Sequence, residues 1–494
     1  MTRVASPAGT LVFSSQSNRA QLSRWASAGR ALRLTPGVYA LDATLPPEAV
    51  ARQHRLAVIA HVWPGAVLCG RSALSGAEPV EGFVYVAHPQ PPRTADLRLP
   101  GLTVRMQRGP GQLPGDMSLP EGLWLSGPAR SLVENVHTVG RPQSSQAGSA
   151  AVEDRLEELA RTGGAGRVRG TLEQLDLIAS SFDAAAVTFV RIRLVALLGT
   201  VTGSPRTTAL GARLAGEPYD THRMAQLEAV CATLARRAPV PRAARPREPR
   251  WAWLAFFEAY FSNFIEGTRF AVEEARAIAI DGAVPVARPA DAHDVAATYR
   301  LAVDPATAAR VPRTADDLLA LLRERHEDLM AARPEKSPGY FKSKPNFAGG
   351  YRFVDPDLAI GTLRRGFGVL DALVDPFARA VAMMVLLTEV HPFDDGNGRL
   401  ARLFVNAELS AAGQVRMVIP TVYRNNYLAA LSGLSSGAGA GESLIAVLDF
   451  AQRWTAAVDW RTYEAADAEI TASHAYLDPV AAENDGLRLQ LPTR

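Results

Sequence analysis

Apolar residues recur at helical spacing through most of the second half of the chain, whereas the first half mixes this spacing with short alternating runs. Beyond residue 250 the pattern predicts helices over 251–264, 315–330 and across 364–390. Asp375-Pro376 is a start signal for the last of these, because proline is tolerated in a first helical turn. With a further periodic segment at 403–409, the second half is predicted to be helical.

The first half predicts an α+β structure. Residues 17–29 favour a short helix, and alternation over 31–40 around Pro36-Gly37 favours a β-hairpin. A helix followed by a hairpin is the back end of a winged helix-turn-helix, although the pattern leaves a plain α+β fragment open. Short β-like runs dominate from 45 to 125, and residues 151–200 are helical with a Gly-rich break at 163–166.

The segment 236–250 separates the two halves. It has four Pro and six Arg among fifteen residues, which is typical of a semi-rigid linker and predicts a domain boundary. Its charge could contact phosphates, but a solvated linker is the favoured interpretation. Residues 1–250 carry 29 Arg and 19 acidic residues (+10), and residues 251–494 carry 24 basic and 31 acidic residues (−7). Two modules with different partners are therefore expected, the basic one suited to nucleic acid.

Composition excludes some classes of protein. Two distant cysteines argue against a disulfide framework and a cysteine zinc site. The N-terminus lacks the apolar run of a signal peptide, and no apolar run approaches the ~20 residues that a bilayer requires, so a cytoplasmic protein is expected. Arg greatly outnumbers Lys, as expected from a GC-rich genome. The only three lysines, Lys336, Lys342 and Lys344, cluster within nine residues.

The stretch 391–402, HPFDDGNGRLAR, predicts an anion-binding loop between two helices. Gly396 and Gly398 let the backbone approach a ligand and expose N–H groups at a helix start, and Asn397 adds a donor. Arg399 and Arg402 are three apart, hence on one helical face, where they can hold outer phosphates.

The same stretch carries groups for chemistry. Asp395 is a hard oxygen ligand suited to Mg²⁺ shared with phosphates. His391, with an ordinary pKa of about 6.5, can accept a hydroxyl proton near neutrality. The GxxxxGK[ST] pattern of a Walker A loop is absent.

This stretch closely resembles the signature of the Fic family, HxFx[DE]GN[GK]R followed by xxR. The resemblance implies an all-helical core with a β-hairpin flap, and transfer of AMP from ATP to a Ser, Thr or Tyr hydroxyl of a protein, with release of pyrophosphate. It implies that His391 is the base and that Asp395 holds Mg²⁺. The ATP-binding residues that it implies are Asp395, Gly396, Asn397, Gly398, Arg399, Leu400, Ala401 and Arg402, with Arg402 at the γ-phosphate.

Residues 262–267, SNFIEG, resemble the family's inhibitory helix, [ST]xxxE[GN]. The resemblance implies an autoinhibited protein in which Glu266, one turn after Ser262, pairs with Arg402. A Glu–Arg pair would remove the cation that holds the γ-phosphate, so ATP would bind unproductively. A routine polar residue at a helix end is the alternative for Glu266.

Two further segments resemble family features. Gly349, Gly350, Tyr351 and Arg352 precede the helical signature region, where the family's flap docks a target by strand addition. Downstream, 424–428 resembles the stretch near the adenine, which implies Tyr427, Leu428 and Ser435 as ATP-binding residues. A surface loop and a core tyrosine, respectively, are the structural alternatives.

Four short motifs of the front half, at 32–39, 72–74, 126–132 and 214–223, resemble the AbiEi-type antitoxin and transcriptional regulator family. The resemblance covers most of residues 14–235 and implies a winged helix-turn-helix joined to an α+β domain. It implies DNA binding, with phosphate contacts that position the protein without reading sequence. The contacts expected are Arg19, Arg24, Arg30 and Arg33.

The domains expected are a winged-helix-like region at 1–70, an AbiEi-like α+β domain at 71–235, the linker at 236–250, a Fic domain at 251–475 and a flexible tail at 476–494. The protein is expected to be an autoinhibited protein adenylyltransferase that uses ATP and Mg²⁺. Removal of AMP, or transfer of another group, at the same site is one alternative. A DNA-binding regulator or antitoxin whose Fic domain senses nucleotide is another, and a homo-oligomer is left open.

Overall fold

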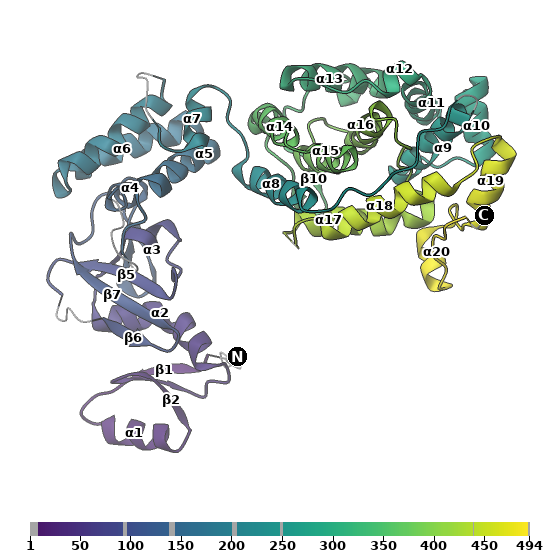
Figure 1. The fold of residues 1–494 in the computed structure, drawn as a ribbon. Coiled ribbons are helices and arrows are strands. Elements are labelled where there is room, and N and C mark those ends of the chain that lie inside the picture. The colour runs from purple at the N-terminus through teal and green to yellow at the C-terminus, as the bar shows by residue number, and fades with distance from the viewer. Residues whose placement is uncertain are drawn as a thin grey trace. The chain divides into compact units, whose positions relative to one another are not determined.

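The chain divides into two compact units, Met1–Gly216 and Glu217–Arg494 (Figure 1). The computed structural model describes residues 8–91, 96–137, 144–199, 205–247, 250–437 and 439–492. Residues 1–7, 248–249 and 493–494, which belong to the predicted winged region, linker and tail, lie outside the described residues.

The first unit begins with a small antiparallel sheet. Strands β1 (Thr10–Phe13), β2 (Ala31–Thr35) and β3 (Val38–Leu41) pair in the order β1-β3-β2, and helix α1 (Arg19–Ser27) precedes the hairpin. The predicted helix and hairpin are confirmed. Within the predicted winged region 1–70, the described residues contain α1 before the hairpin and a second long helix, Pro47–Val62, after it, and the winged helix-turn-helix stays a prediction.

A six-stranded mixed sheet follows, with the order β6-β7-β5-β4-β9-β8. One apolar core joins residues before position 70, such as Leu34 and Val58, to Val84 and Val104 of the sheet, so the core continues across the boundary expected there. The elements are α2 (Pro47–Val62), β4 (Val67–Leu68), α3 (Gly70–Leu74), β5 (Phe83–His88), β6 (Leu97–Leu99), β7 (Leu102–Arg108), β8 (Met117–Ser118) and β9 (Trp124–Leu125).

Four helices complete the described part of the first unit, and three of them, α4, α5 and α6, share an apolar core of their own. The predicted Gly-rich break is a kink inside one long helix, where Gly164 takes φ of 58° and ψ of −165°. The helices are α4 (Pro128–Glu134), α5 (Ser149–Ile178), α6 (Ala184–Leu197) and α7 (Thr208–Leu214).

In its described residues, the second unit is helical apart from one short hairpin and an isolated β-bridge between Ala244 and Gln414. Helices α15 and α16 are buried almost all round, α15 with mainly apolar residues and α16 with several buried polar ones. They pack against each other in the middle, with α13 on one side and α17 and α18 on the other (Figure 1). The elements are α8 (Thr221–Ala235), α9 (Arg250–Ile265), α10 (Val272–Asp281), α11 (Pro289–Val303), α12 (Pro305–Ala308), α13 (Ala315–Met330), β10 (Phe347–Ala348), β11 (Tyr351–Arg352), α14 (Pro356–Leu370), α15 (Pro376–Val390), α16 (Asn397–Ala411), α17 (Arg424–Ser435), α18 (Glu442–Ala457), α19 (Tyr463–Ala472) and α20 (Pro479–Asn484).

The linker prediction needs correction. The division between the units falls at Gly216, before α8, and α8 packs against α14 and α15. Most of residues 236–247 are exposed, as the linker prediction expected, but Arg242 contacts the helical unit, 2.6 Å from Asp449 and 3.9 Å above the ring of Phe377. Backbone bonds from Val415 and Arg245 add to this. Among the linker arginines, Arg242 thus contacts both an acid and an aromatic ring.

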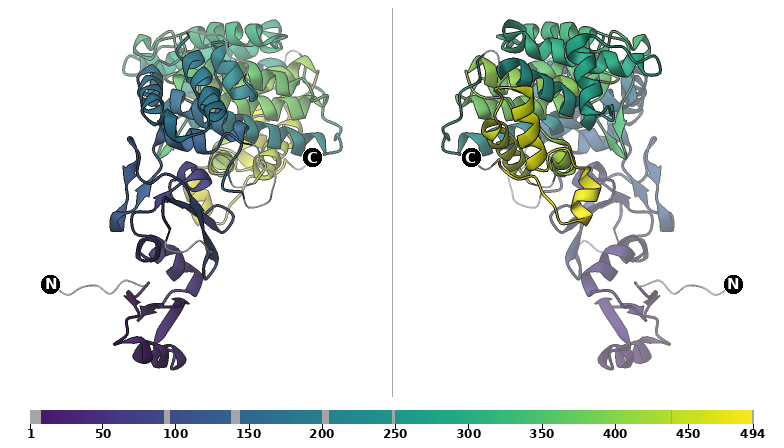
Figure 2. Two further views of the ribbon diagram at one scale, coloured as in Figure 1. Left: turned by 90° about the vertical axis from the view of Figure 1, so that its left-hand side faces the viewer. Right: turned by 90° about the vertical axis from the view of Figure 1, so that its right-hand side faces the viewer.

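The expected flexible tail is also corrected. Residues 476–492 include the short helix α20, and Ala482 and Leu489 are buried in an apolar core shared with α9. Figure 2 shows the yellow C-terminal helices lying against the outside of the helical unit. No helix in the described ranges combines the length and apolarity that crossing a membrane requires.

Candidate active site

His391 lies just after the last residue of α15, in the left-handed backbone conformation (φ 50°) that ends the helix. Its ring nitrogen Nδ1 is 3.2 Å from the carbonyl oxygen of Thr388. A carbonyl only accepts, so Nδ1–H is the donor and Nε2 carries the lone pair. The backbone thus selects the tautomer that a general base needs.

The imidazole is enclosed by the hairpin side of the site. The Phe353 ring stacks on it, with centroids 3.8 Å apart and planes 8° from parallel. Burial lowers the pKa of His391 to about 4; the Thr388 carbonyl opposes the shift, and the charge of Lys342 adds to it. His391 is therefore neutral at physiological pH.

The loop after His391 is closed by its own side chains. Asn397 accepts a hydrogen bond from the Phe393 N–H (2.9 Å) and donates one to the Phe393 carbonyl (2.7 Å). The Phe393 ring stacks on His326 of α13 at 3.7 Å. His326 accepts from the Gly339 N–H and so donates through Nε2 to the Asp395 carbonyl. The Asn397 side chain thus holds the loop in shape, and its role as a ligand donor stays a prediction.

Lys342 contacts the loop from the segment before the hairpin. It is 5% exposed, and its ammonium donates to the carbonyl of Val390 (3.0 Å) and to Asn346 (2.8 Å). Asn346 donates in turn to the carbonyls of His391 and Phe393. Burial lowers the pKa of Lys342 to about 8, against the charges of Asp355 and Asp394. Of the three clustered lysines, Lys342 thus has a structural role beside His391.

Arg402 of α16 is held by the end of α9. Its Nη2 lies 2.7 Å from Glu266 Oε1 and also donates to the Ser262 carbonyl, while its Nε donates to the Ser262 hydroxyl. Gly398 makes this approach possible, because a Cβ there would lie 2.2 Å from Glu266 Oε1. The contact expected between Glu266 and Arg402 is therefore present.

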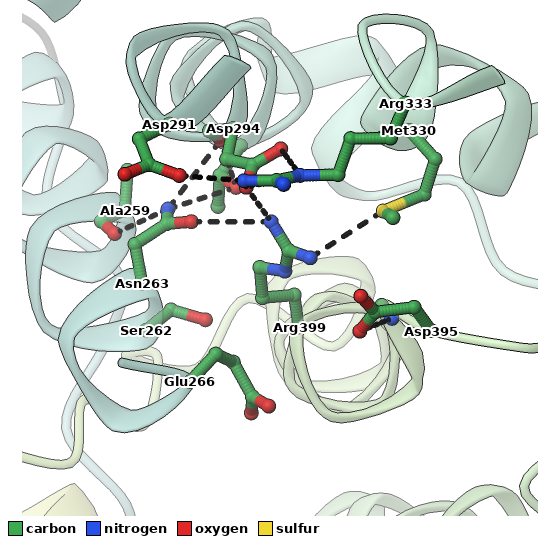
Figure 3. Close-up of polar contacts among 12 residues, drawn as sticks. Ala259, Ser262, Asn263, Glu266, Asp291, Asp294, Met330, Arg333, Asp395 and Arg399 are labelled. Atoms are coloured by element: carbon green, nitrogen blue, oxygen red, sulfur yellow. Dashed lines mark hydrogen bonds and ion pairs between the residues drawn. The ribbon is translucent and has the colours of Figure 1, made fainter. Parts of the chain in front are cut away.

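Arg399 has a different set of partners. Its guanidinium pairs with Asp294 of α11 at 2.8 Å, and its Nη2 contacts the sulfur of Met330. It is 3% exposed. In Figure 3 it points toward Asp294 and Asn263 rather than toward Glu266.

A cavity of about 440 Å³ opens between the hairpin, the signature loop and α17. It brings together eight of the predicted residues and six that the sequence did not indicate. Arg399 is not among its lining residues, and Leu400 and Ala401 are buried inside α16. The lining residues are Glu266, Ala348, Tyr351, Phe353, Thr388, Glu389, His391, Gly398, Arg402, Tyr427, Leu428, Leu431, Ser432 and Ser435.

The remaining predicted residues lie around the cavity rather than in its wall. Gly396 takes φ of 74° at the start of α16, and the partly exposed Asp395 accepts the Gly396 N–H. Gly349 and Gly350 form the turn between β10 and β11, and in this hairpin Arg352 pairs with Phe347. Its role as a flap stays a prediction.

Glu389 is the principal acid of the cavity that sequence reasoning missed. It accepts hydrogen bonds from the Tyr351 and Ser435 hydroxyls and pairs with Arg223 of α8 at 3.2 Å. Tyr427, at 1% exposure, is packed in the core and also lines the cavity, and its role in binding ATP stays a prediction. Glu389 lies two residues before His391, and that spacing was the only signal for it.

Known proteins share this part of the chain. Residues 316–409 match the model of the Fic/DOC family. Protein adenylyltransferase fic-1 of Caenorhabditis elegans is 25% identical over 184 residues, 36% of each chain. Protein adenylyltransferase Fic of Culex quinquefasciatus is 29% identical over 178 residues, 34% of each. The chain therefore spans about a third of the length of these curated relatives.

Among solved structures, a Fic domain-containing signaling protein from Bacteroides thetaiotaomicron is 21% identical, with a TM-score of 0.37. The alignment covers 50% of this chain and 97% of that one. The family model covers none of residues 14–235, so the AbiEi-type resemblance stays a prediction. The chain contains a domain of the Fic/DOC family, built around His391 and the loop that follows it.

Proposed function

We propose that the second unit transfers AMP from ATP to a Ser, Thr or Tyr hydroxyl of a protein and that Glu266 holds this activity low. The observation that carries the proposal is the neutral His391, whose Nδ1 is occupied by Thr388 and whose ring lines the same cavity as Arg402. The relatives named protein adenylyltransferase support the same reaction.

In this reaction the target hydroxyl oxygen attacks the α-phosphorus of ATP. The bond from that phosphorus to the bridging oxygen breaks, pyrophosphate leaves, and His391 takes the hydroxyl proton on Nε2. The loop N–H groups at the start of α16 stabilise charge on the transferred group, and Arg402 binds the outer phosphates once Glu266 releases it.

Asp395 fits a magnesium ion shared with the substrate. It is a single, partly exposed carboxylate beside the loop, and Mg²⁺ is commonly held by one or two carboxylates plus phosphate oxygens. In the described ranges no group of three or more His, Cys, Asp or Glu side chains forms a fuller metal site. The ion would offset phosphate charge.

The test uses the full chain with Glu266→Gly, ATP labelled on either the α- or the γ-phosphate, and a cell lysate. We expect protein-bound label from α-labelled ATP and the mass of AMP on a hydroxyl side chain by mass spectrometry. His391→Ala in the same background is the control and loses the label. Protein-bound label from γ-labelled ATP would overturn adenylyl transfer. Faster transfer from UTP or GTP than from ATP would show that the transferred group is UMP or GMP rather than AMP.

Removal of AMP is a second candidate, because Glu266 and His391 line one cavity and Glu266 could position a water there. Incubating an AMP-modified target with the wild-type chain tests it. Release of AMP by wild type, but not by Glu266→Gly, would favour removal.

We also propose that the first unit binds DNA, because Arg19, Arg24, Arg30 and Arg33 are all exposed on α1 and the hairpin. Phosphate contacts of this kind weaken steeply with salt. In a mobility-shift assay, binding of the full chain to a promoter fragment should weaken as salt rises from about 50 to about 200 mM, the range in which counterion release acts. Binding should also weaken when the four arginines are replaced together. Salt-independent binding would contradict the proposal.

A further inference from the structure

The first arginine of the signature motif, Arg399, is directed into a buried ion network instead of the cavity. Asp294, 1% exposed, lies 2.8 Å from Arg399 and also 2.8 Å from Arg333, at the end of α13. Arg333 continues to Asp291, one helical turn before Asp294. Figure 3 shows Arg399 and Arg333 meeting at the Asp294 carboxylate.

The network also contacts α9, the helix that leads to Glu266. The Asn263 amide donates to the carbonyls of Ala259 and Asp294 and to the Thr298 hydroxyl, and its oxygen lies 3.5 Å from Arg399. Three segments, α9, α11 and α16, are therefore tied at one buried point. Asp294 lies on α11, outside the residues that the family model covers.

These contacts fix the first turn of α16, where little space is left for the backbone to move. Gly398 is one residue before Arg399, and the space above it is filled by Glu266 and Arg402. A buried carboxylate between two guanidiniums resists displacement, because separating it would leave uncompensated charges in the interior. A shift of about 1 Å in a phosphate-binding group can cost about a hundredfold in rate.

We propose that Asp294 is a positioning residue: it holds Arg399, and through it the Gly396–Gly398 loop, in the geometry that binds phosphates. Arg399 then acts through this ion pair and not as a direct phosphate ligand, a role that Arg402 fills. The inference rests on the proposed nucleotide site and refines it, since Arg399 was predicted from the motif to bind the phosphate chain. The Arg399 Nε, buried without a hydrogen-bond partner, is the atom through which a direct role would act.

The experiment separates the two arginines by nucleotide affinity. In the Glu266→Gly full chain, the dissociation constants of ATP and AMP are measured for Arg399→Gln and Arg402→Gln. Arg402→Gln should weaken ATP more than tenfold and AMP less than threefold. Arg399→Gln should change the ratio of the two constants less than threefold. A larger change in that ratio for Arg399→Gln would show direct phosphate binding and overturn the proposal.

Transfer rates test Asp294 itself. Asp294→Asn and Arg399→Gln should each lower kcat more than tenfold, and the double variant should be at least as active as Arg399→Gln, because Asn and Gln can pair without charge. Asp291→Asn, one turn away and not bonded to Arg399, should change kcat less than threefold. A kcat of the double variant below that of Arg399→Gln would contradict the proposal.

Two further comparisons apply if a variant fails to fold or if the parent protein is inactive. If Asp294→Asn fails to fold, as its melting curve would show, the double variant and Arg399→Gln still decide the question. If the Glu266→Gly parent transfers nothing, the proposed reaction fails, whereas the affinity ratios still test the role of Arg399.

Discussion

Arg402 and Arg399 lie one turn apart on α16, yet their surroundings differ. Arg402 pairs with Glu266, whose side chain is 31% exposed and lines the cavity. Arg399 pairs with Asp294, which is 1% exposed and shared with Arg333. The first pair can open by rotation of a solvent-exposed carboxylate, whereas opening the second would strand charges in the interior.

The comparison indicates a division of labour on one helix. The exposed pair is suited to control, because a ligand phosphate can replace Glu266 as the partner of Arg402. The enclosed pair is suited to keeping the helix start in place while that exchange occurs. Aromatic packing supports this arrangement, since Phe257 and Phe261 hold α9 in a buried core with Trp454 and Trp460.

The largest expected difference between the pairs is in stability. Asp294→Asn should lower the free energy of unfolding by about 3–5 kcal/mol, because it leaves the buried Arg399 guanidinium without its counter-charge. Glu266→Gln should cost about 1 kcal/mol or less, since its carboxylate is partly solvated. Urea unfolding of both variants measures the difference. Equal losses would show that the two pairs are energetically alike and remove the basis of the comparison.

The next effect is on activity. Glu266→Gly should raise AMP transfer roughly 10- to 100-fold, which is about 1.4–2.7 kcal/mol of barrier. The reason is that Arg402 becomes available to the γ-phosphate. In an Arg402→Gln background the same change should give little increase, because the cation that Glu266 blocks is already absent. Initial rates with α-labelled ATP measure both. An unchanged rate in the first variant would refute control by Glu266.

Much of the helical unit was predictable from sequence. The apolar periodicity gave α9, α13 and part of α16, and the spacing of the signature placed His391 at a helix end. The single helix predicted across 364–390 is wrong, because the structure divides it at 371–375 into α14 and α15. The motif also predicted the contact between Glu266 and Arg402, although these residues lie 136 positions apart. Local pattern and a short motif sufficed because each of these features depends on neighbouring residues or on one recognisable contact.

Other parts of the site depend on tertiary packing and were not predictable. Nothing local to Asp294 or Glu389 shows that they face Arg399 and Arg223, because α11 and α8 reach these positions only through the fold. The same holds for Arg242, which was expected to be solvated but pairs with Asp449. Charged residues in a sequence reveal their partners only when the helices that carry them are packed.

A smaller effect concerns the base side of the cavity. Lys342→Met should lower the free energy of unfolding by about 1–3 kcal/mol, because the buried Val390 carbonyl loses its donor. It should also slow transfer, since Val390 precedes His391. Lys344→Met, at an exposed position two residues on, is the matched control and should change neither. Identical urea unfolding curves and transfer rates for the two variants would show that Lys342 has no structural role and that the lysines cluster by chance.

The smallest expected effect is a shift in pH dependence at His391. Its pKa is lowered to about 4 chiefly by burial, with Lys342 adding to the shift and Glu266 and Asp395 opposing it. The base must be neutral to act, so transfer by a Glu266→Gly chain should stay nearly constant as pH falls from 7.5 to 5.5 (about one and a half units above the His391 pKa).

Phe353→Ala removes the ring that covers the imidazole, so the pKa of His391 should rise toward its ordinary value of about 6.5. Transfer should then decline at a pH roughly one unit or more higher than in the parent, as the protonated form accumulates. Phe353→Leu keeps an apolar cover and should behave like the parent. Rates of the three proteins, measured side by side in the same buffers with ATP in excess, share any titration of ATP itself. If the transfer rate falls at the same acidic pH in all three proteins, Phe353 does not keep His391 neutral. The hydrogen bond from His391 Nδ1 to the Thr388 carbonyl would then be the contact that prepares His391 as a base.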